Sequence, residues 1–324
     1  MRQVTLVLGA TGHIGQAVVR HWLERGHAVT AATRQSNPRA LAGLPVRVVQ
    51  IDQELSRLRE LAAGHDLLID AAAPIPLGPA VNGSESWRRV IEGAAMRTER
   101  VLDAARVHGL RLGFFSSFTT LPRHESPVRA REAAWRRSAY PYFEAKVTME
   151  RMMLEAAQGG MAVAVVNPAA CLGPWEYRPD TSSLVPLVLS GRLPVVMNQM
   201  SNVIDVRDVA AGMELALLHE CYGRPIPLAG HNLTPAELVG RIAAAGGRRG
   251  AAPMAVPTLW ASTAGLWAEM AYAAMGRPAP DEWRAVPLIG DNFPMARSAE
   301  QTAIGLRIRP LEETIRDAVA FHVA

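Results

Sequence analysis

A glycine-rich motif near the start of the chain constrains the fold most. The apolar run 3–8 precedes Gly9, Gly12 and Gly15, and an apolar stripe at helical spacing follows in residues 16–23. A buried strand, a tight turn and a helix start in this order make an anion site, because the first backbone N–H groups of a helix have no partner within it. Gly9 permits the turn, Gly12 allows close approach of a pyrophosphate, and Gly15 lets the helix pack on the strand. The motif predicts a dinucleotide site rather than a plain structural turn.

Apolar runs that alternate with helical segments continue this pattern through the first half of the chain. The expected strands cover residues 28–33, 45–51, 66–71, 110–115 and 162–166, and the expected helices cover residues 55–63, 87–108 and 143–158. Continuously apolar strands that alternate with helices are typical of a parallel sheet covered on both faces. We therefore predict an α/β fold, a Rossmann doubly wound parallel sheet. Residues 1–168 are predicted to form its nucleotide-binding domain, completed by about residues 201–222, and residues 169–324 to form mainly a smaller, interleaved substrate-binding region.

The composition is that of a globular protein and excludes several other classes. Of the 324 residues, 49% are hydrophobic and 20% are charged, which is ordinary for a globular chain. The net charge of +4 includes no basic run, so we expect no nucleic-acid partner. Cys171 and Cys221 lie too far apart in sequence for a metal pair, so neither a metal site nor a disulfide framework is predicted. The chain opens on a strand rather than a signal peptide, and a cytoplasmic location is expected.

One apolar stretch, residues 257–275, approaches the length of a membrane span. Glu269 and several small residues interrupt it, and a carboxylate is costly inside a bilayer. We expect a buried helix or a lid here, without stable insertion in a membrane.

The end of the second strand indicates which dinucleotide is bound. An acidic side chain there would bind the ribose hydroxyls of NAD, but Thr33 occupies that place, Arg34 follows it and Arg39 lies nearby. A guanidinium offers paired hydrogen bonds to a 2′-phosphate, which a carboxylate would repel. We therefore predict NADP (NADPH) as the cofactor, the alternative being that Arg34 is a solvated loop residue. Asp52, just past the third strand, is a candidate acceptor for the adenine amine, and Ala72 would let the backbone pass close to the ribose.

A tyrosine and a lysine one helical turn apart are the candidate catalytic pair. Tyr142 and Lys146 lie near a predicted helix start, so both side chains project from one face. A phenol is a poor acid at neutral pH, but a neighbouring ammonium lowers its pKa and can also bind the cofactor ribose. A carbonyl that accepts a hydride must then take a proton, which such a tyrosine can supply. Ser117, at the end of the fifth strand, is the predicted donor to the same oxygen, with Ser116 and Thr119 as close rivals.

These motifs, in this order, resemble those of the extended short-chain dehydrogenase/reductase family of NAD(P)-dependent epimerase/dehydratase type. The matching motifs are GATGHIG at Gly9–Gly15, SS at Ser116–Ser117, YxxxK at Tyr142–Lys146, NPAACLGP at Asn167–Pro174 and DVRDVA at Asp205–Ala210. The resemblance implies a Rossmann domain, a small C-terminal substrate domain and a Ser-Tyr-Lys site beneath a bound nicotinamide. It also places Thr11, His13 and Ile14 among the cofactor-binding residues.

Within that family, the chain is closest in motif to the dihydroflavonol-reductase-like branch. Sugar dehydratases of the family have an acidic pair directly after the catalytic hydroxyl residue, whereas residues 118–120 here are Phe-Thr-Thr. The Asn-Pro pair that begins at Asn167 also resembles the reductase-like branch. We expect Asn167 to orient the nicotinamide carboxamide or the substrate, the alternative being a cap at the strand end. One departure is Ala94, which stands where the family often has an asparagine, so a water relay through that residue would be absent or rerouted.

The C-terminal half supplies the candidate substrate pocket. Thr119, Trp175, Tyr177 and Met197 are the candidate lining residues, and core packing is the alternative for each of them. Further apolar candidates are Leu184, Met200, Trp260, Trp267 and Met295. As a group they favour a hydrophobic or aromatic carbonyl compound over a nucleotide sugar. The sequence leaves the oligomeric state open, with a homodimer among the options.

The leading hypothesis is an NADPH-dependent oxidoreductase that reduces a ketone, or oxidises a secondary alcohol, of a largely apolar small molecule. One alternative is a nucleotide-sugar epimerase with tightly bound NAD. A second, from another class, is a non-catalytic cofactor-sensing protein, which the retained Tyr142 and Lys146 disfavour. The identity of the substrate lies beyond what these motifs specify.

Overall fold

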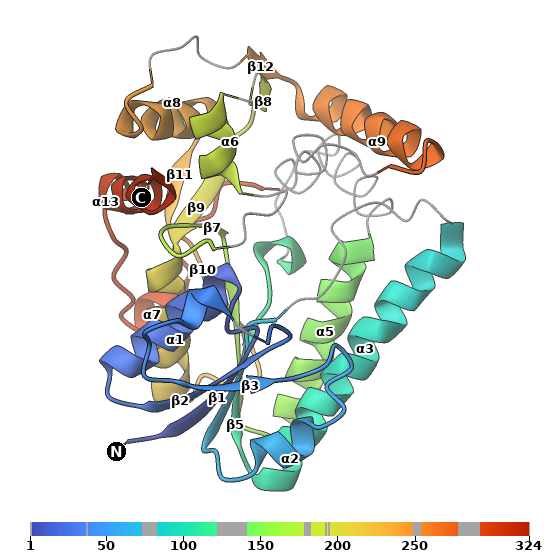
Figure 1. The fold of residues 1–324 in the computed structure, drawn as a ribbon, viewed down its shortest axis with the longest axis vertical. Coiled ribbons are helices and arrows are strands. Elements are labelled where there is room, and N and C mark those ends of the chain that lie inside the picture. Colours follow the sequence, from blue (N-terminus) through green and yellow to red (C-terminus); the bar gives the residue numbers. More distant parts are fainter. Residues whose placement is uncertain are drawn as a thin grey trace.

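A parallel sheet with helices on both faces forms the larger part of the molecule (Figure 1). The computed structural model describes residues 2–36, 38–72, 83–121, 141–177, 183–191, 193, 195–248, 254–277 and 292–323. The predicted α/β Rossmann fold with a doubly wound parallel sheet is confirmed.

Seven described strands pair side by side in this sheet, and every pairing between them is parallel. In spatial order they are β10 (Pro225–Leu228), β6 (Val163–Pro168), β5 (Arg111–Phe115), β4 (Leu67–Asp70), β1 (Val4–Leu8), β2 (Ala28–Thr33) and β3 (Arg47–Gln50). The helices that accompany them are α1 (His13–Glu24), α2 (Leu58–Ala62), α3 (Gly83–His108), α5 (Pro141–Gln158) and α7 (Val206–Leu218). Two short 3-10 turns, η1 (Arg39–Leu41) and η2 (Phe118–Thr120), follow strand ends.

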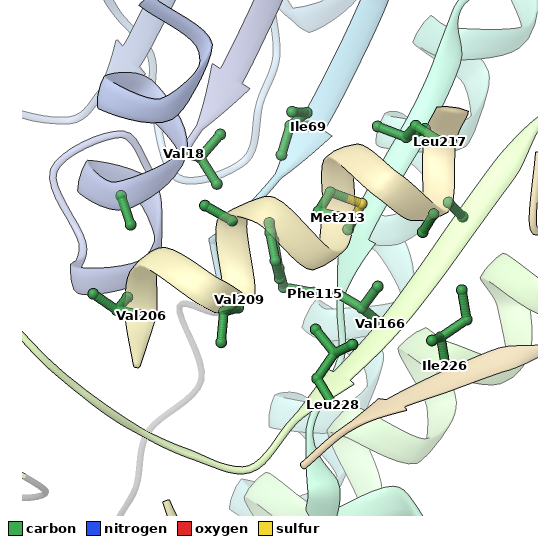
Figure 2. Packing of buried hydrophobic residues seen from close by; sticks show 14 of the residues in the cluster. Val18, Ile69, Phe115, Val166, Val206, Val209, Met213, Leu217, Ile226 and Leu228 are labelled. Carbon is green, nitrogen blue, oxygen red and sulfur yellow. The ribbon is translucent and has the colours of Figure 1, made fainter. Parts of the chain in front are cut away.

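Both faces of the sheet are buried, as the continuously apolar strands predict. Side chains alternate along each strand, so Val7 packs into one core cluster while Leu6 and Leu8 pack into another. The first cluster lies beneath α1 and α7, where Met213 meets strand residues such as Phe115 (Figure 2). The second lies beneath α3 and α5. All of these strands run in the same direction, so their carboxyl ends share one edge, where such folds bind ligands.

A few elements differ from the expected ones in their bounds or were not expected. The expected helix at residues 55–63 begins only at Leu58, because Leu55 adopts a left-handed conformation with φ of 59°. The helix expected from residue 87 already begins at Gly83. The strand β10, which no apolar pattern in the sequence indicates, lies just past the segment 201–222 and pairs with β6. It contains two prolines and stands at the edge of the sheet, where proline is tolerated.

A smaller unit follows β6 and has its own apolar core, which includes Val188, Leu238 and Ile315. Its strands are β7 (Ala170–Leu172), β9 (Ser201–Asp205) and β11 (His231–Leu233) in one small sheet, with β8 (Val195–Met197) and β12 (Met254–Val256) in another. Its helices are α6 (Leu184–Ser190), α8 (Pro235–Ala245), α9 (Thr258–Ala274) and α13 (Leu311–Val323), while α12 (Ala299–Ala303) packs against β10 of the large sheet. Because β10 and α7 return to the large sheet, the two parts of the chain interleave.

The DVRDVA motif ties α7 to the last helix. Asp205 caps α7 and accepts hydrogen bonds from Arg207 and, at 2.8 Å, from Thr314 Oγ1. Arg207 also pairs with Asp317 at 2.6 Å. Asp208 accepts a hydrogen bond from the backbone N–H of Arg309 at 2.7 Å. The acids of this motif therefore hold the C-terminal segment in place.

Among the described residues, no helix combines the length and the apolar character that a membrane crossing needs. On α9, Trp260 and Trp267 are 74% and 66% exposed, while Glu269 is buried.

Candidate active site

The glycine turn has the close contacts that a pyrophosphate cradle needs. Gly9 has φ of +72°, and a Cβ at this residue would lie 2.9 Å from the Ala71 carbonyl oxygen. A Cβ on Gly15 would lie only 2.0 Å from the Gly9 carbonyl oxygen, so only glycine lets α1 start this close to the turn. Gly12 occupies the N-cap of α1 and has no side chain to cap the helix. The first N–H groups of α1 are thus left for an anion.

The other residues of the motif fix this turn in the molecule. The hydroxyl oxygens of Thr11 and Thr33 lie 3.3 Å apart and join the turn to the end of β2. His13 Nε2 donates to the Pro174 carbonyl oxygen at 3.1 Å, because a carbonyl oxygen can only accept. Burial lowers the pKa of His13, so its imidazole is neutral at neutral pH. Ile14 packs against the core cluster beneath α1.

Arg34 lies exposed directly after β2, beside the end of β3. Its Nη1 donates to Gln53 Oε1 at 3.4 Å. Asp52, in the same region, accepts hydrogen bonds from the backbone N–H of Ser56 at 2.9 Å and from the Ser56 hydroxyl. These bonds lower the pKa of Asp52. Asp52 thus serves the local turn in this structure, and its contact with an adenine amine stays a prediction.

Lys146 is buried where α5 passes the end of β5. Its Nζ donates to the Phe115 carbonyl oxygen at 3.1 Å and lies 5.5 Å from the centre of the Phe114 ring. Burial lowers the pKa of Lys146 to about 8, against the opposing influence of nearby carboxylates. Tyr142 lies one turn earlier on α5, half-buried, with its ring edge-on to Phe143 at 5.6 Å. At neutral pH the helix therefore presents a phenol and an ammonium on one face.

Ser117 lies at the start of η2, and its hydroxyl is buried. Its Oγ accepts hydrogen bonds from the Thr119 N–H at 3.2 Å and from the Thr119 hydroxyl at 2.9 Å. Both donors use acceptor positions of Ser117 Oγ, so the Ser117 proton remains for another oxygen. Thr119 therefore supports Ser117, and η2 itself packs against α5.

A buried carboxylate that the sequence analysis did not name lies at the centre of this region. Glu150 Oε2 accepts hydrogen bonds from the hydroxyls of Ser116 and Thr120 and from Asn167 Nδ2. Asn167, at the end of β6, is fully buried and also donates to the Ser117 carbonyl oxygen at 3.2 Å. The helical spacing of Glu150 from Lys146 could have revealed it, because residues four apart share a face.

A buried ion pair near Lys146 was also not predicted from the sequence. Arg97 of α3 binds Asp70, the last residue of β4, through two hydrogen bonds of 2.6 Å. Asp70 also accepts from the Ala72 N–H at 3.1 Å. The pair thus braces the backbone that touches Gly9, while its charges act on Lys146 in opposite directions. The two residues of the ion pair belong to different elements, α3 and β4, so no local spacing in the sequence predicts their contact.

The candidate lining residues of the substrate pocket lie in different surroundings. Trp175 follows β7 with its ring 5.0 Å from the Arg20 guanidinium of α1. Tyr177 is 42% exposed, and its ring packs on Phe321 at 4.9 Å. Met197 is buried in the smaller unit. Their contact with a substrate stays a prediction.

A family model described as the NAD dependent epimerase/dehydratase family matches residues 5–225. The chain belongs to this family, as the motif resemblance indicates. It is 31% identical over 233 residues to a "Putative dihydroflavonol 4-reductase" of Synechocystis sp. (strain ATCC 27184 / PCC 6803 / Kazusa), covering 67% of this chain and 63% of that protein. It is 29% identical over 243 residues to "Sterol demethylase protein B" of Methylococcus capsulatus (strain ATCC 33009 / NCIMB 11132 / Bath), covering 72% of each.

Solved structures share the fold across the chain. The crystal structure of gox2253 aligns with a TM-score of 0.77 and 23% identity, covering 99% of this chain and 98% of that one. UDP-glucose 4-epimerase of Thermus thermophilus, solved with NAD, aligns with a TM-score of 0.71 and 19% identity, covering 99% of each. The glycine cradle fits such a cofactor, since a Cβ at Gly9 or Gly15 would collide with backbone atoms. The family match, rather than these structures, indicates an NAD(P)-dependent enzyme of the reductase/epimerase type.

Proposed function

We propose that this enzyme uses NADPH to reduce the ketone of a largely apolar small molecule, or catalyses the reverse oxidation of a secondary alcohol. The hydroxyl of Ser117 carries the proposal, because Thr119 fills two of its acceptor positions and leaves the Ser117 proton for a carbonyl oxygen. The segment that bears Ser117 packs on the helix that bears Tyr142 and Lys146. Donors gathered around one oxygen suit a carbonyl that gains negative charge.

Each side chain then has a distinct part in the reaction. A nicotinamide bound beside these residues would supply the hydride. Ser117 donates a hydrogen bond to the carbonyl oxygen, and Tyr142 gives that oxygen its proton. Lys146, protonated below its pKa of about 8, lowers the pKa of the phenol and binds the cofactor ribose.

The preference for NADPH rests on Arg34. Its guanidinium is exposed at the end of β2, where Thr33 replaces the acidic residue that would bind ribose hydroxyls. Arg34→Ala removes charge-assisted hydrogen bonds to the 2′-phosphate, so the Kd for NADPH should rise about tenfold or more. The Kd for NADH should stay near that of the wild type, as fluorescence titration can measure.

Arg57→Ala is the matched control, because Arg57 is also exposed but pairs with Glu60 on the surface. It should leave both affinities unchanged. Equal weakening of NADPH and NADH binding by Arg34→Ala would refute the phosphate contact.

Two observations support an apolar ketone as the substrate. The relatives described above are named "Putative dihydroflavonol 4-reductase" and "Sterol demethylase protein B", and both names refer to small molecules without a nucleotide. The residues that follow Ser117, Phe-Thr-Thr, supply no acid for a sugar dehydration.

A cofactor-oxidation screen tests the proposal. Purified protein is mixed with NADPH or NADH and with a panel that includes a dihydroflavonol, a steroid ketone, aliphatic ketones and a nucleotide sugar. We expect NADPH to be consumed with one of the ketones. Conversion of the nucleotide sugar without net oxidation of cofactor would instead support the epimerase alternative.

A further inference from the structure

Glu150 is a buried carboxylate on α5, the helix that also carries Tyr142 and Lys146. It lies one helical turn after Lys146 and two after Tyr142, and its side chain is 8% exposed. Buried carboxylates need several donors to offset the loss of water. Glu150 Oε2 has three, which are the Ser116 hydroxyl, the Thr120 hydroxyl at 2.7 Å and Asn167 Nδ2 at 2.5 Å. Glu150 thereby joins the ends of β5 and β6 to the catalytic helix.

These contacts fix the orientation of the Asn167 side-chain amide. Its Nδ2 faces the carboxylate of Glu150 and the Ser117 carbonyl oxygen at 3.2 Å. Both of those oxygens can only accept, so the amino group must be the end of the amide that points toward them. The opposite end, Asn167 Oδ1, is an acceptor that must therefore face away from Glu150.

Asn167 Oδ1 itself is buried and has no hydrogen-bond partner among the described residues. A fully buried acceptor without a donor is rare in native proteins and points to a group that binds there. The bound nicotinamide carries a carboxamide, whose NH₂ is such a donor. Asn167 lies at the carboxyl end of β6, the edge of the sheet where this cofactor belongs.

We propose that Glu150 is a positioning residue that sets the polarity of Asn167, so that Asn167 Oδ1 accepts a hydrogen bond from the nicotinamide carboxamide. Through Ser116 and Thr120 it also holds the segment that bears Ser117 against α5. This role of Glu150 rests on one part of the proposed function, namely that a nicotinamide cofactor binds at this site. Its direct test measures binding, which keeps it separate from the choice of ketone.

The test compares NADP with its 3-acetylpyridine analogue, in which a methyl ketone replaces the carboxamide and the NH₂ donor is lost. The wild type should bind NADP about tenfold more tightly than the analogue, the value of one hydrogen bond to a buried acceptor. In Glu150→Gln, the new side-chain NH₂ can donate to Asn167 Oδ1 once the Asn167 amide turns over, so only the Ser117 carbonyl oxygen still favours the original orientation. The preference for NADP should then fall severalfold in fluorescence titrations.

A double-mutant cycle separates positioning from general damage to the fold. Asn167→Ala should abolish the preference for NADP, and Glu150→Gln in that background should change it no further. Glu150→Asp keeps an acceptor-only carboxylate and should retain part of the preference. Glu155→Gln is the control, because Glu155 is exposed on the same helix, and it should match the wild type.

A pH profile gives a second readout. The charged groups that act on Lys146 are Asp70 from β4, Arg97 from α3 and Glu150 from α5 itself. Loss of the Glu150 charge makes it easier for Lys146 to lose its proton. Reduction by Glu150→Gln should therefore decline at lower pH than reduction by the wild type, with kcat down about tenfold.

The proposal is overturned if Glu150→Gln keeps the full preference for NADP over the analogue, or if its effect adds to that of Asn167→Ala. Should Glu150→Gln fail to fold, the comparison of Glu150→Asp with Asn167→Ala decides in the same way. If no ketone is reduced in the screen but the preference for NADP over the analogue is as expected, only the proposed function is contradicted.

Discussion

The two ends of the cofactor site are built by different means. At the pyrophosphate end, the structure offers backbone N–H groups at the start of α1. The shape of this turn depends on glycine at positions 9, 12 and 15, where a Cβ would lie close to backbone atoms. At the nicotinamide end, the structure offers buried side chains from separate elements, with Lys146 and Glu150 on α5 facing the ends of β5 and β6.

The two ends can therefore perform different chemistry. Backbone groups and a helix start provide a fixed positive potential that binds an anion but has no proton to give at neutral pH. Side chains with altered pKa values can hold and transfer a proton. We therefore expect changes at the glycine turn to affect binding, and changes at the nicotinamide end to affect the rate of reaction.

The largest expected effect is on the reaction rate at the nicotinamide end. Tyr142→Phe removes only the phenolic hydroxyl, so kcat for ketone reduction should fall about 1000-fold. The Kd for NADPH should stay within about twofold of wild type, because the phenol serves the reacting oxygen rather than the cofactor. Steady-state kinetics and fluorescence titration measure the two quantities. A variant that keeps its rate would remove Tyr142 from the reaction.

The next effect is on binding at the glycine turn. In Gly15→Ala the new Cβ would meet the Gly9 carbonyl oxygen at 2.0 Å, so α1 must move away from the turn. We expect the Kd for NADPH to rise about 100-fold, while kcat at saturating NADPH changes little.

Gly240→Ala is the matched control for this substitution. Gly240 lies within α8, and a Cβ there has open space. The alanine should leave binding unchanged and slightly stabilise the helix, since alanine has the higher helix propensity. If Gly15→Ala behaved as Gly240→Ala does, the close approach of α1 to the turn would be wrong.

The smallest effect is on stability and depends on pH. Lys146 has a pKa of about 8 in the folded protein, against 10.5 as the ordinary value. Between these values the unfolded chain binds more protons, so the free energy of unfolding should rise as pH increases from about 8 to 10.5. Lys146→Met has no such charge to bury and should be more stable than the wild type by about 1–3 kcal/mol at pH 7.

Urea unfolding at about pH 7 and about pH 9.5 measures this difference, since the two values lie on either side of the folded-state pKa. The advantage of Lys146→Met should shrink at the higher pH. A gap that is the same at both values would show that the lysine charge costs the folded state nothing.

The sequence predicted the parts of the site that depend on local spacing. Gly9–Gly15 needs only a strand, a turn and a helix in succession, and Tyr142 and Lys146 share a face because one helical turn separates them. The parallel sheet followed from continuously apolar strands. The strand β10 did not, because its two prolines hide the pattern of a strand and only its edge position tolerates them.

Contacts between distant residues could not be predicted in this way. Glu150 and Asn167 lie 17 positions apart, and Asp70 and Arg97 lie 27 apart. No period of a helix or strand links such pairs, so only the packing of α5 and α3 against the sheet reveals them. Local spacing in the sequence therefore indicates the groups that we propose to act on the substrate, but not the buried charges beside them.

Transfer of an isotopic label reports whether the hydride passes from NADPH to the ketone carbon. The enzyme is supplied with NADPH that carries deuterium at the transferred position of the nicotinamide, together with the ketone identified by the screen. We expect one deuterium on the carbinol carbon of the product for each NADPH oxidised, as mass spectrometry would show. Product without the label, or a nucleotide sugar epimerised with no NADPH consumed, would rule out ketone reduction by hydride transfer from NADPH.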